Sequence, residues 1–277
     1  MFAASHTEAR PHDTRATYHA GVAKLTAITR KVSPALARCE LTHLDREPID
    51  VARASTQHDA YERRLESLGC RVVSLPAEPE LPDSVFVEDV AIVVDELAVV
   101  TRPGAASRRP ETASVARALA THRPLAEIAA PGTLDGGDVL RLGLRLLVGE
   151  SGRSNDAGIE QLATLLRPHG YSVEAIGVHG CLHLKSAVTQ VAPDAVLVNP
   201  AWVDRAAFAG WRVIEVDPNE AYAANALLIG DTAIYPTAFP RTAARLERAG
   251  IRLVMVDLSE LAKAEGAVTC CSVILAG

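Results

Sequence analysis

The sequence predicts an α/β fold built as a closed ring of five similar units, and three observations support this prediction. Short β-branched runs alternate with amphipathic stretches from Val22 onward. The order strand, turn, strand, helix, strand recurs at intervals of roughly 40–50 residues, a spacing typical of repeat architectures. One of the five units is complete only when strands from the two ends of the chain are combined, and such a unit closes a ring.

Four units follow one another along the chain. Each starts with two strands joined by a turn; these pairs are Ser84–Val94 with Leu97–Thr101, Thr133–Leu142 with Arg145–Val148, His183–Val191 with Ala195–Val198, and Ala223–Ile229 with Thr232–Tyr235. The connecting residues, for example Asp95–Glu96 and Gly230–Asp231, are typical of tight hairpins. A helical stretch follows each pair, over Arg109–Thr121, Asn155–Arg167, a short piece near Val203, and Pro240–Arg248. One more strand ends each unit: Glu127–Ala129, Ser172–Ile176, Arg212–Val216 and Arg252–Val256.

The fifth unit is predicted from a helix over Ala54–Leu68 and the strand Arg71–Leu75, with a hairpin formed by Lys24–Thr29 and Val268–Leu275. Units of this kind can also form an open doubly wound sheet. The recurring hairpins and the need to pair the two terminal runs favour the ring. Residues 1–21 are polar and His-rich, so we expect a disordered leader followed by a single domain over 22–277.

Composition excludes several classes of function. The 277 residues carry a formal net charge of −6 without a basic stripe, which argues against nucleic-acid binding. No apolar run reaches the ~18–20 residues of a spanning helix, and the first residues lack the apolar block of a secretory signal. Five irregularly spaced cysteines are typical of free thiols in a reducing compartment. These observations predict a soluble cytoplasmic protein.

Residues capable of chemistry recur where the first strand of a unit begins. In a ring, equivalent strand ends converge on one central mouth, so four distant segments would supply a single pocket. The residues concerned are Asp83, Glu88 and Asp89 in LPDSVFVEDV, Asp135 and Asp138 in TLDGGDVL, His183 in GCLHLKS, and Cys270 in TCCS.

Each of these residues also has an ordinary structural interpretation. A lone cysteine is usually a small buried hydrophobe, and neighbours in a strand point to opposite faces, so Cys270 and Cys271 cannot both face one cavity. A histidine between leucines is often a satisfied core residue, and Asp135 could serve a Gly-rich turn. The strand around Glu88 and Asp89 predicts that one of this pair is buried and requires a partner.

The pattern lacks the spacing of a metal site or a phosphate loop, so the carboxylates imply a ligand that brings its own positive charge. A planar guanidinium pairs well with carboxylates. The thiolate of Cys270 could add to its central carbon, and His183 could protonate the departing amine. Arg102 and Arg153, both next to turns, could hold an α-carboxylate.

Seven segments in order resemble the dimethylarginine dimethylaminohydrolase family: FVEDVAIV, VTRPGAASRR, PGTLDGGDVL, GESGRSN, LHLKS, YAAN and TCCS. The resemblance covers about Leu41 to Leu275. It implies a five-bladed α/β propeller with a central active-site pocket, as in the guanidine-modifying (amidinotransferase-like) superfamily. It also implies hydrolysis of Nω,Nω-dimethyl-L-arginine and Nω-monomethyl-L-arginine to citrulline and the methylated amine, through a covalent thiouronium-type intermediate.

Residue by residue, the resemblance makes Cys270 the nucleophile, His183 the general acid and base, and Asp135 the carboxylate that orients His183 or the guanidinium. The substrate-binding positions that it implies are Glu88 and Asp89 for the guanidinium, Asp83, Arg102 and Arg153 for the amino-acid end, Leu41 in a mobile lid, and the backbone near Ala264. It implies no cofactor, although some relatives bind inhibitory zinc at the thiol corresponding to Cys270. The partner is a small cationic substrate, and a homodimer is left open.

Two alternatives remain at this stage. An arginine deiminase-like enzyme would act on another guanidine, although such enzymes carry an added helical domain and read HLDT where LHLKS stands here. A non-catalytic methylarginine-binding protein would not need thiol, imidazole and acids together.

Overall fold

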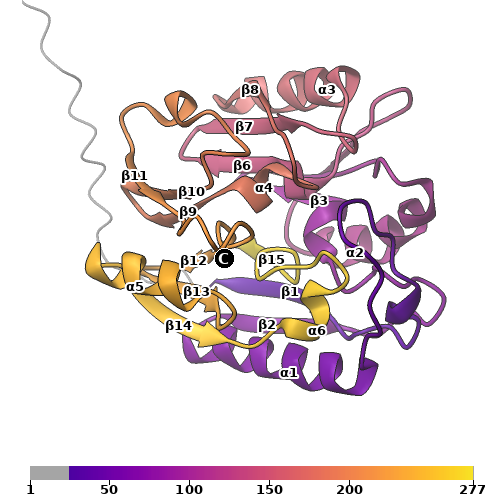
Figure 1. Ribbon diagram of the computed structural model, residues 1–277. Helices are drawn as coiled ribbons and strands as arrows, with labels where there is room; N and C mark the ends of the chain where they lie inside the picture. Colours follow the sequence, from indigo (N-terminus) through magenta and orange to yellow (C-terminus); the bar gives the residue numbers. More distant parts are fainter. Residues whose placement is uncertain (1–24, 277) are drawn as a thin grey trace, which may run out of the picture.

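The computed structural model describes residues 25–276, which form a mixed α/β fold with five three-stranded sheets (Figure 1). In spatial order the sheets are β15 (Val273–Leu275), β1 (Thr26–Arg30) and β2 (Arg71–Leu75); β3 (Ala91–Val93), β4 (Ala98–Val100) and β5 (Leu125–Glu127); β6 (Val139–Leu142), β7 (Arg145–Glu150) and β8 (Ser172–Gly177); β9 (Val188–Ala192), β10 (Ala195–Val198) and β11 (Arg212–Glu215); β12 (Leu227–Ile229), β13 (Thr232–Pro236) and β14 (Arg252–Val256).

All five sheets share one connection pattern. The first two strands of each sheet are antiparallel, and the central strand pairs in parallel with the third. A parallel pair requires a crossover segment. The five crossovers contain α1 (Val51–Ser67), α2 (Thr112–Leu119), α3 (Asp156–Leu166), η6 (Arg205–Phe208) and α5 (Pro240–Arg248). In Figure 1 the longer crossover helices lie on the periphery, with the strands between them.

The predicted fifth unit is confirmed, because one sheet joins the two ends of the described chain. β15 runs antiparallel to β1 with Thr26 opposite Leu275, and β1 runs parallel to β2 with Thr26 opposite Arg71. The helix α1 connects β1 to β2. The segment after Cys270 is therefore held in place by pairing with a strand near the start of the chain.

Five apolar clusters join the sheets in cyclic order. Successive clusters pack the β1 sheet against the β4 sheet, β4 against β7, β7 against β10, β10 against β13, and β13 against β1. The cluster between the β13 and β1 sheets includes Tyr61 and Leu65 of α1, together with Cys271. Each sheet therefore has two neighbours, and the last sheet packs against the first.

The predicted first strands begin too early, because each is preceded by a tight helical turn. Val87–Val90 and Gly136–Asp138 are 3₁₀ turns (η2 and η4), Leu184–Ala187 is one helical turn (α4), and residues 268–271 form turns before β15. A short buried turn has the same apolar content as a buried strand, so the two cannot be distinguished by pattern. Glu88 and Asp89 therefore lie in a 3₁₀ turn and not in the predicted strand.

Four further elements complete the description of residues 25–276: η1 (Leu36–Arg38), η3 (Ala106–Glu111), η5 (Arg167–His169) and α6 (Ser259–Ala262). The predicted helix Arg109–Thr121 is thus divided between η3 and α2. The expected leader, 1–21, lies outside the described residues. Among the helices described, none has the length and apolarity needed to cross a membrane.

Candidate active site

The turns that precede the first strands deliver side chains to one small cavity. Six of the predicted site residues line it, namely Asp83, Asp89, Arg153, His183, Ala264 and Cys270. Glu40, Phe86, Arg108, Leu182 and Glu265 complete the lining. The thiol, the imidazole and the acids that lay far apart in the sequence therefore do meet. Asp135, Glu88, Arg102 and Leu41 do not line the cavity, and each is placed below.

The two adjacent cysteines have different surroundings. Cys270 lines the cavity and is partly exposed, whereas Cys271 is completely buried in the apolar cluster between the β13 and β1 sheets. The carbonyl of Cys270 accepts a hydrogen bond from the backbone N–H of Glu88 at 3.1 Å, which fixes one turn against the other. Burial raises the pKa of the Cys270 thiol to about 12, and the charges of Asp89 and Glu88 act in the same direction.

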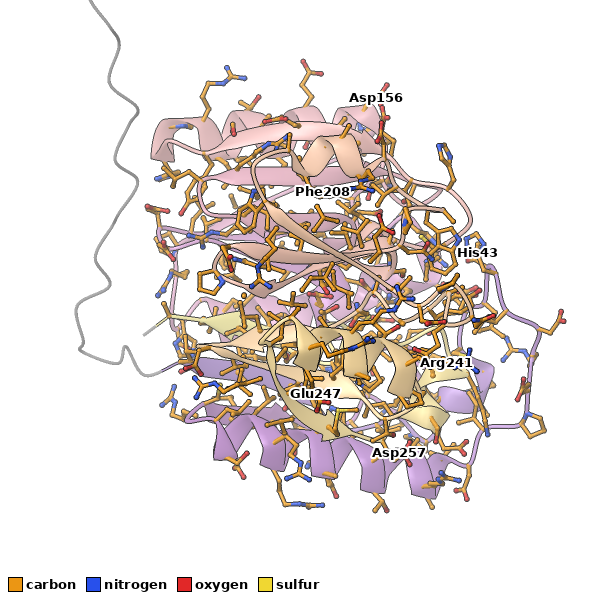
Figure 2. All side chains as sticks on the ribbon, turned by 60° about the vertical axis from the view of Figure 1, so that its left-hand side comes forward. His43, Asp156, Phe208, Arg241, Glu247 and Asp257 are labelled. Carbon is orange, nitrogen blue, oxygen red and sulfur yellow. The ribbon has the colours of Figure 1, made fainter. Side chains whose placement is uncertain are left out.

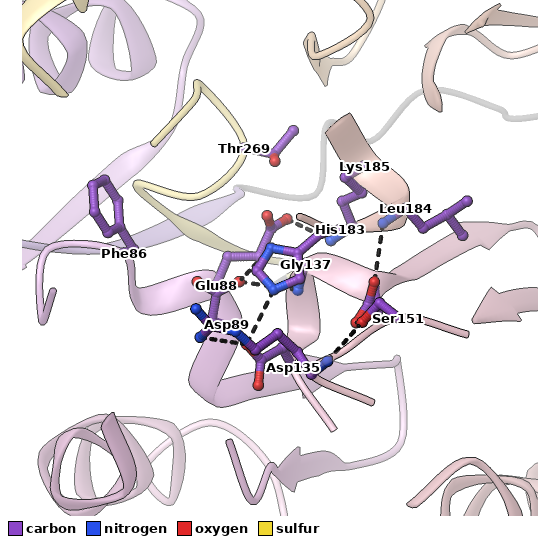
Figure 3. Close-up of polar contacts among 12 residues, drawn as sticks. Phe86, Glu88, Asp89, Asp135, Gly137, Ser151, His183, Leu184, Lys185 and Thr269 are labelled. Carbon is purple, nitrogen blue, oxygen red and sulfur yellow. Dashed lines mark hydrogen bonds and ion pairs between the residues drawn. The ribbon is translucent and has the colours of Figure 1, made fainter. Parts of the chain in front are cut away.

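His183 lies between two carboxylates (Figure 3). Its Nε2 is 3.0 Å from Asp135 Oδ2, and its Nδ1 is 3.8 Å from Asp89 Oδ1. Burial alone would lower the pKa of His183, but the surrounding carboxylates, Asp89 and Asp138 first, raise it to about 9. The imidazole is therefore protonated at neutral pH and is able to donate a proton.

Asp135 lies behind the imidazole. It is completely buried, and its other oxygen, Oδ1, accepts a hydrogen bond from the N–H of Gly104 at 2.9 Å. The guanidinium Nη1 of Arg153 is 3.8 Å from Asp135 Oδ2. Asp135 thus contacts the imidazole from within the protein and is placed to orient it.

Asp138 anchors the turn that carries His183. One of its oxygens accepts the hydroxyls of Ser151 and Ser154, each at 2.6 Å, and the other accepts the N–H of Leu184 at 3.0 Å. Because Leu184 directly follows His183 and begins α4, this contact fixes the backbone of the turn that carries the His183 imidazole. Burial raises the pKa of Asp138, and hydrogen bonding from the two serines opposes that rise.

The glycine pair in TLDGGDVL permits close approach of two turns. A Cβ on Gly136 would lie 2.0 Å from the carbonyl oxygen of Glu88, and one on Gly137 would lie 2.6 Å from His183 Nδ1. Both contacts are too short for any side chain. The N–H of Gly137 donates to Asp89 Oδ1 at 3.1 Å, so the turn also supplies a hydrogen bond. The motif is both a structural turn and part of the site.

Glu88 and Asp89 point to opposite sides of η2. Asp89 faces the cavity that Cys270 and His183 line, and its Oδ2 accepts a hydrogen bond from Nη1 of Arg108 at 2.5 Å. Burial alone would raise the pKa of Asp89, but the positive charges of His183 and Arg108 lower it. Glu88 instead pairs with Lys185 Nζ at 2.5 Å and lines a second cavity between the first strands of the sheets. Its predicted contact with a guanidinium in the catalytic cavity therefore requires a correction.

Arg108 is the cation among the cavity-lining residues that sequence reasoning missed. It is buried, lines the cavity, and binds Glu111 as well as Asp89. The inference that a ligand must bring the positive charge overlooked two protein cations, because Arg108 pairs with Asp89 and Lys185 pairs with Glu88. Arg102, selected for its place beside a turn, donates to the carbonyl of Gly132 at 3.1 Å and does not line the cavity. A buried acid requires a partner, and the VTRPGAASRR stretch contains Arg108 as well as Arg102. That requirement is the signal that could have identified Arg108.

The segment 40–44 passes beside the cavity. Its Glu40 N–H donates to Asp83 Oδ2 at 3.1 Å, while Leu41 packs partly buried against an apolar cluster. Burial raises the pKa of Asp83, and the charge of Arg108 opposes that rise. Ala264 lines the cavity as expected, and its neighbour Glu265 does so as well. Leu41 is thus near the site without lining it.

No family model matches the sequence. The chain is 41% identical over 250 residues to N(G),N(G)-dimethylarginine dimethylaminohydrolase of Streptomyces coelicolor, covering 90% of this chain and 96% of that protein. It is 36% identical over 225 residues to the enzyme of the same name from Pseudomonas aeruginosa, covering 80% and 89%.

Solved structures agree with these relatives. The P. aeruginosa enzyme, as a cysteine-to-serine mutant complexed with citrulline, superposes with a TM-score of 0.87 at 34% identity, covering 90% of this chain and 98% of that one. The N-terminal domain of ArgZ, a cyanobacterial arginine dihydrolase, has a TM-score of 0.79 at 18% identity, covering 91% and 98%, which is a likeness of fold alone. From the identity over most of both chains, this protein is a hydrolase that belongs to the dimethylarginine dimethylaminohydrolase family.

Proposed function

We propose that this protein hydrolyses Nω,Nω-dimethyl-L-arginine, and Nω-monomethyl-L-arginine, to L-citrulline and the corresponding methylated amine. The observation that carries the proposal is the meeting of Cys270, protonated His183 and Asp89 in one cavity. The relative solved with citrulline supports it, since citrulline is the product expected when a methylated amine is replaced by oxygen.

The charge of the cavity supports a cationic substrate. Four carboxylates line it (Glu40, Asp83, Asp89 and Glu265), against the two guanidiniums of Arg108 and Arg153. Even with His183 protonated, negative charge exceeds positive charge, which favours a ligand that carries a guanidinium. We assign the guanidinium end to Asp89, beside Cys270 and His183. Asp83, Arg108, Arg153 and the backbone at Ala264 would then hold the amino-acid end.

The proposed reaction has two stages. The Cys270 thiolate adds to the guanidinium carbon, and dimethylamine leaves with a proton from His183, which gives a thiouronium intermediate. His183 then takes a proton from water and the hydroxide adds to the same carbon. The carbon–sulfur bond breaks to release the thiolate, and the hydroxyl proton of the product passes to solvent, which leaves citrulline. Asp135 orients the imidazole throughout. The scheme uses only these side chains and water, so we propose that it needs no cofactor.

Formation of the thiolate would depend on the substrate. With a pKa of about 12, Cys270 is protonated at neutral pH in the described structure. A guanidinium next to the sulfur would lower that pKa, because a neighbouring positive charge stabilises a thiolate. The thiol proton would then pass to solvent as the substrate binds. This arrangement keeps the free enzyme's thiol unreactive.

We also propose the finer architecture: a single catalytic domain over 22–277 in which the five sheets are the blades of an α/β propeller. The cyclic order of the five apolar clusters supports this proposal. Free thiols at all five cysteines support a cytoplasmic location. A homodimer is open to test by sedimentation of the purified protein.

The decisive experiment is an assay of citrulline and amine release from dimethylarginine, monomethylarginine and arginine. We expect kcat/KM for the methylated substrates to exceed that for arginine. Faster turnover of arginine would favour a deiminase instead. Binding of methylarginine without turnover would favour a non-catalytic binding protein.

A further inference from the structure

Glu265 makes an unusual set of contacts for a side chain at the rim of the cavity. Its carboxylate accepts three consecutive backbone N–H groups: those of Thr42 at 3.0 Å, His43 at 2.5 Å and Leu44 at 2.7 Å. Figure 2 labels His43 on this segment, on the right-hand side of the molecule. Hydrogen bonds to an ionised acceptor are among the stronger ones in proteins. The carboxylate therefore holds the backbone of segment 42–44 from one side.

The backbone of Glu265 indicates that this side chain has a specific purpose. Its φ of 56° is the one left-handed value among the non-glycine residues in the described range 25–276. It follows α6, where its N–H bonds to the carbonyl of Ala262 and that of Gly266 bonds to Leu261. This position after a helix usually holds glycine or asparagine, because other residues adopt the conformation at a cost. Glutamate is disfavoured here on backbone grounds, and its contacts with segment 42–44 offset that cost.

The other side of the same segment contacts the catalytic machinery. Arg153 Nη2 donates to Thr42 Oγ1 at 3.0 Å. The other terminal nitrogen of Arg153, Nη1, lies 3.8 Å from Asp135 Oδ2, and Asp135 in turn contacts His183 at 3.0 Å. Arg153 lies in the loop between β7 and α3, whereas Glu265 follows α6. Segment 42–44 therefore links Glu265 to an arginine that lines the cavity.

We propose that Glu265 is a positioning residue that selects substrates carrying an α-carboxylate. By holding segment 42–44, Glu265 keeps the Thr42 hydroxyl where it accepts a hydrogen bond from Arg153. This contact fixes the Arg153 guanidinium, which we assign to the amino-acid end of the substrate. The inference rests on the proposed function, because the role of Arg153 toward a carboxylate is part of it. The substrate class that follows is methylated arginine as a free amino acid, in preference to the decarboxylated amine.

The test compares two substrates with the same reacting group. Nω,Nω-dimethyl-L-arginine carries the α-carboxylate, and Nω,Nω-dimethylagmatine lacks it. For Glu265→Ala we expect kcat/KM for dimethylarginine to fall roughly 10- to 100-fold, mainly through a higher KM. A loss of this size corresponds to the free energy of one charge-assisted hydrogen bond. We expect less than about a 3-fold change with dimethylagmatine. Glu247→Gln, at an exposed glutamate on α5, is the matched control and should change neither value.

Two further measurements separate positioning from general damage. Thr42→Val removes the acceptor for Arg153 but keeps the N–H groups that bind Glu265. It should reproduce the carboxylate-dependent loss, and the double variant should be no worse than Glu265→Ala alone, since both act through one contact. Hydrogen exchange at the amides of Thr42, His43 and Leu44 should accelerate in Glu265→Ala and stay slow in Thr42→Val.

The outcomes distinguish this inference from the function beneath it. Absence of methylarginine turnover in the unaltered protein would refute the proposed function, and the exchange experiment would still decide whether Glu265 holds the segment. Equal losses on both substrates, or unchanged amide exchange in Glu265→Ala, would overturn the inference.

Discussion

The two sides of the turn Val87–Val90 are built from neighbouring residues but are suited to different tasks. On one side, Asp89 faces a cavity that also contains a thiol, an imidazole and two arginines. On the other side, Glu88 and Lys185 form one pair in a cavity otherwise lined mainly by residues of the first strands. Negative charge exceeds positive charge on the first side, whereas on the second side Glu88 pairs with Lys185 and the other lining cation, Arg141, pairs with Asp95 outside the cavity. The difference teaches that an excess of charge, rather than its presence, marks the catalytic side.

The same division recurs at two other short segments. His183 faces the catalytic cavity, and Lys185, two residues later, faces the second one. Cys270 lines the catalytic cavity, and Cys271 is buried in the core. Each segment thus offers a pair of nearby residues in which one should control turnover and the other stability.

The cysteine pair should give the largest contrast. Cys270→Ser should lower turnover by more than about 10⁴-fold, because the covalent step loses its nucleophile. Cys271→Ser should leave turnover within a few-fold of normal but lower the free energy of unfolding by about 1–3 kcal/mol, since it buries a hydroxyl in an apolar cluster. Citrulline release and thermal unfolding measure the two effects. The reverse pattern would show that Cys271, and not Cys270, is the nucleophile.

The second contrast is between His183 and Lys185. His183→Ala should lower kcat by roughly 10²–10⁴-fold through loss of the proton donor for the leaving amine. Lys185→Met leaves the largely buried Glu88 without its cation, and it should cost about 3 kcal/mol of stability, with a smaller effect on kcat. Steady-state kinetics and urea unfolding of both variants check this. Near-normal kcat in His183→Ala would remove the imidazole from the proton transfer.

The acid pair sharpens the comparison further. Asp89→Asn should lower kcat/KM by an amount equal to about 2 kcal/mol of lost transition-state stabilisation. This is the lower end of the range for buried charge pairs, because asparagine can still accept the hydrogen bond from the N–H of Gly137. Glu88→Gln should act mainly on stability, because its carboxylate faces Lys185 and the second cavity. If Glu88→Gln instead lost substrate affinity while Asp89→Asn kept it, the two sides of the turn would have been assigned the wrong way round.

The pH dependence of stability tests the imidazole of the same comparison. The pKa of His183, about 9, is above the ordinary value near 6.5, so its protonated form stabilises the folded state. That contribution is fully present below pH ~6.5 and is lost as the pH rises through about 9. Melting temperatures should therefore fall between these values in the unaltered protein more than in His183→Asn. Identical curves for the two proteins would show that the carboxylates do not hold the imidazolium.

The parts of the structure that sequence could predict are those with strong local patterns. The strands Arg71–Leu75 and Arg252–Val256 and the helix Pro240–Arg248 were predicted with the observed bounds. Amphipathic spacing and turn residues determine these elements locally. The helical turns before the first strands were missed, because a buried turn of four residues has no periodicity of its own.

The candidate site likewise contains residues that local sequence could predict and residues that it could not. Cys270, His183 and Asp89 were predicted because they stand in recognisable positions of repeated units. Arg108 was missed, and Glu88 was placed on the wrong side, because ion pairing depends on contacts between segments that sequence does not show. Glu88 and Lys185 are 97 positions apart, and Glu265 is more than 220 from the amides it binds.

The sheet shared by β1 and β15 also bears on how the enzyme becomes active during folding. Two residues separate Cys270 from β15, whose pairing partner β1 lies at the opposite end of the described chain. Closing so long a loop is entropically costly and is expected to occur late. A folding intermediate with the other four sheets in place would already display its acids and imidazole while the reactive sulfur was still unanchored. Activity would then appear only after β15 has paired with β1. During refolding, recovery of activity would be slower than recovery of the helical circular-dichroism signal.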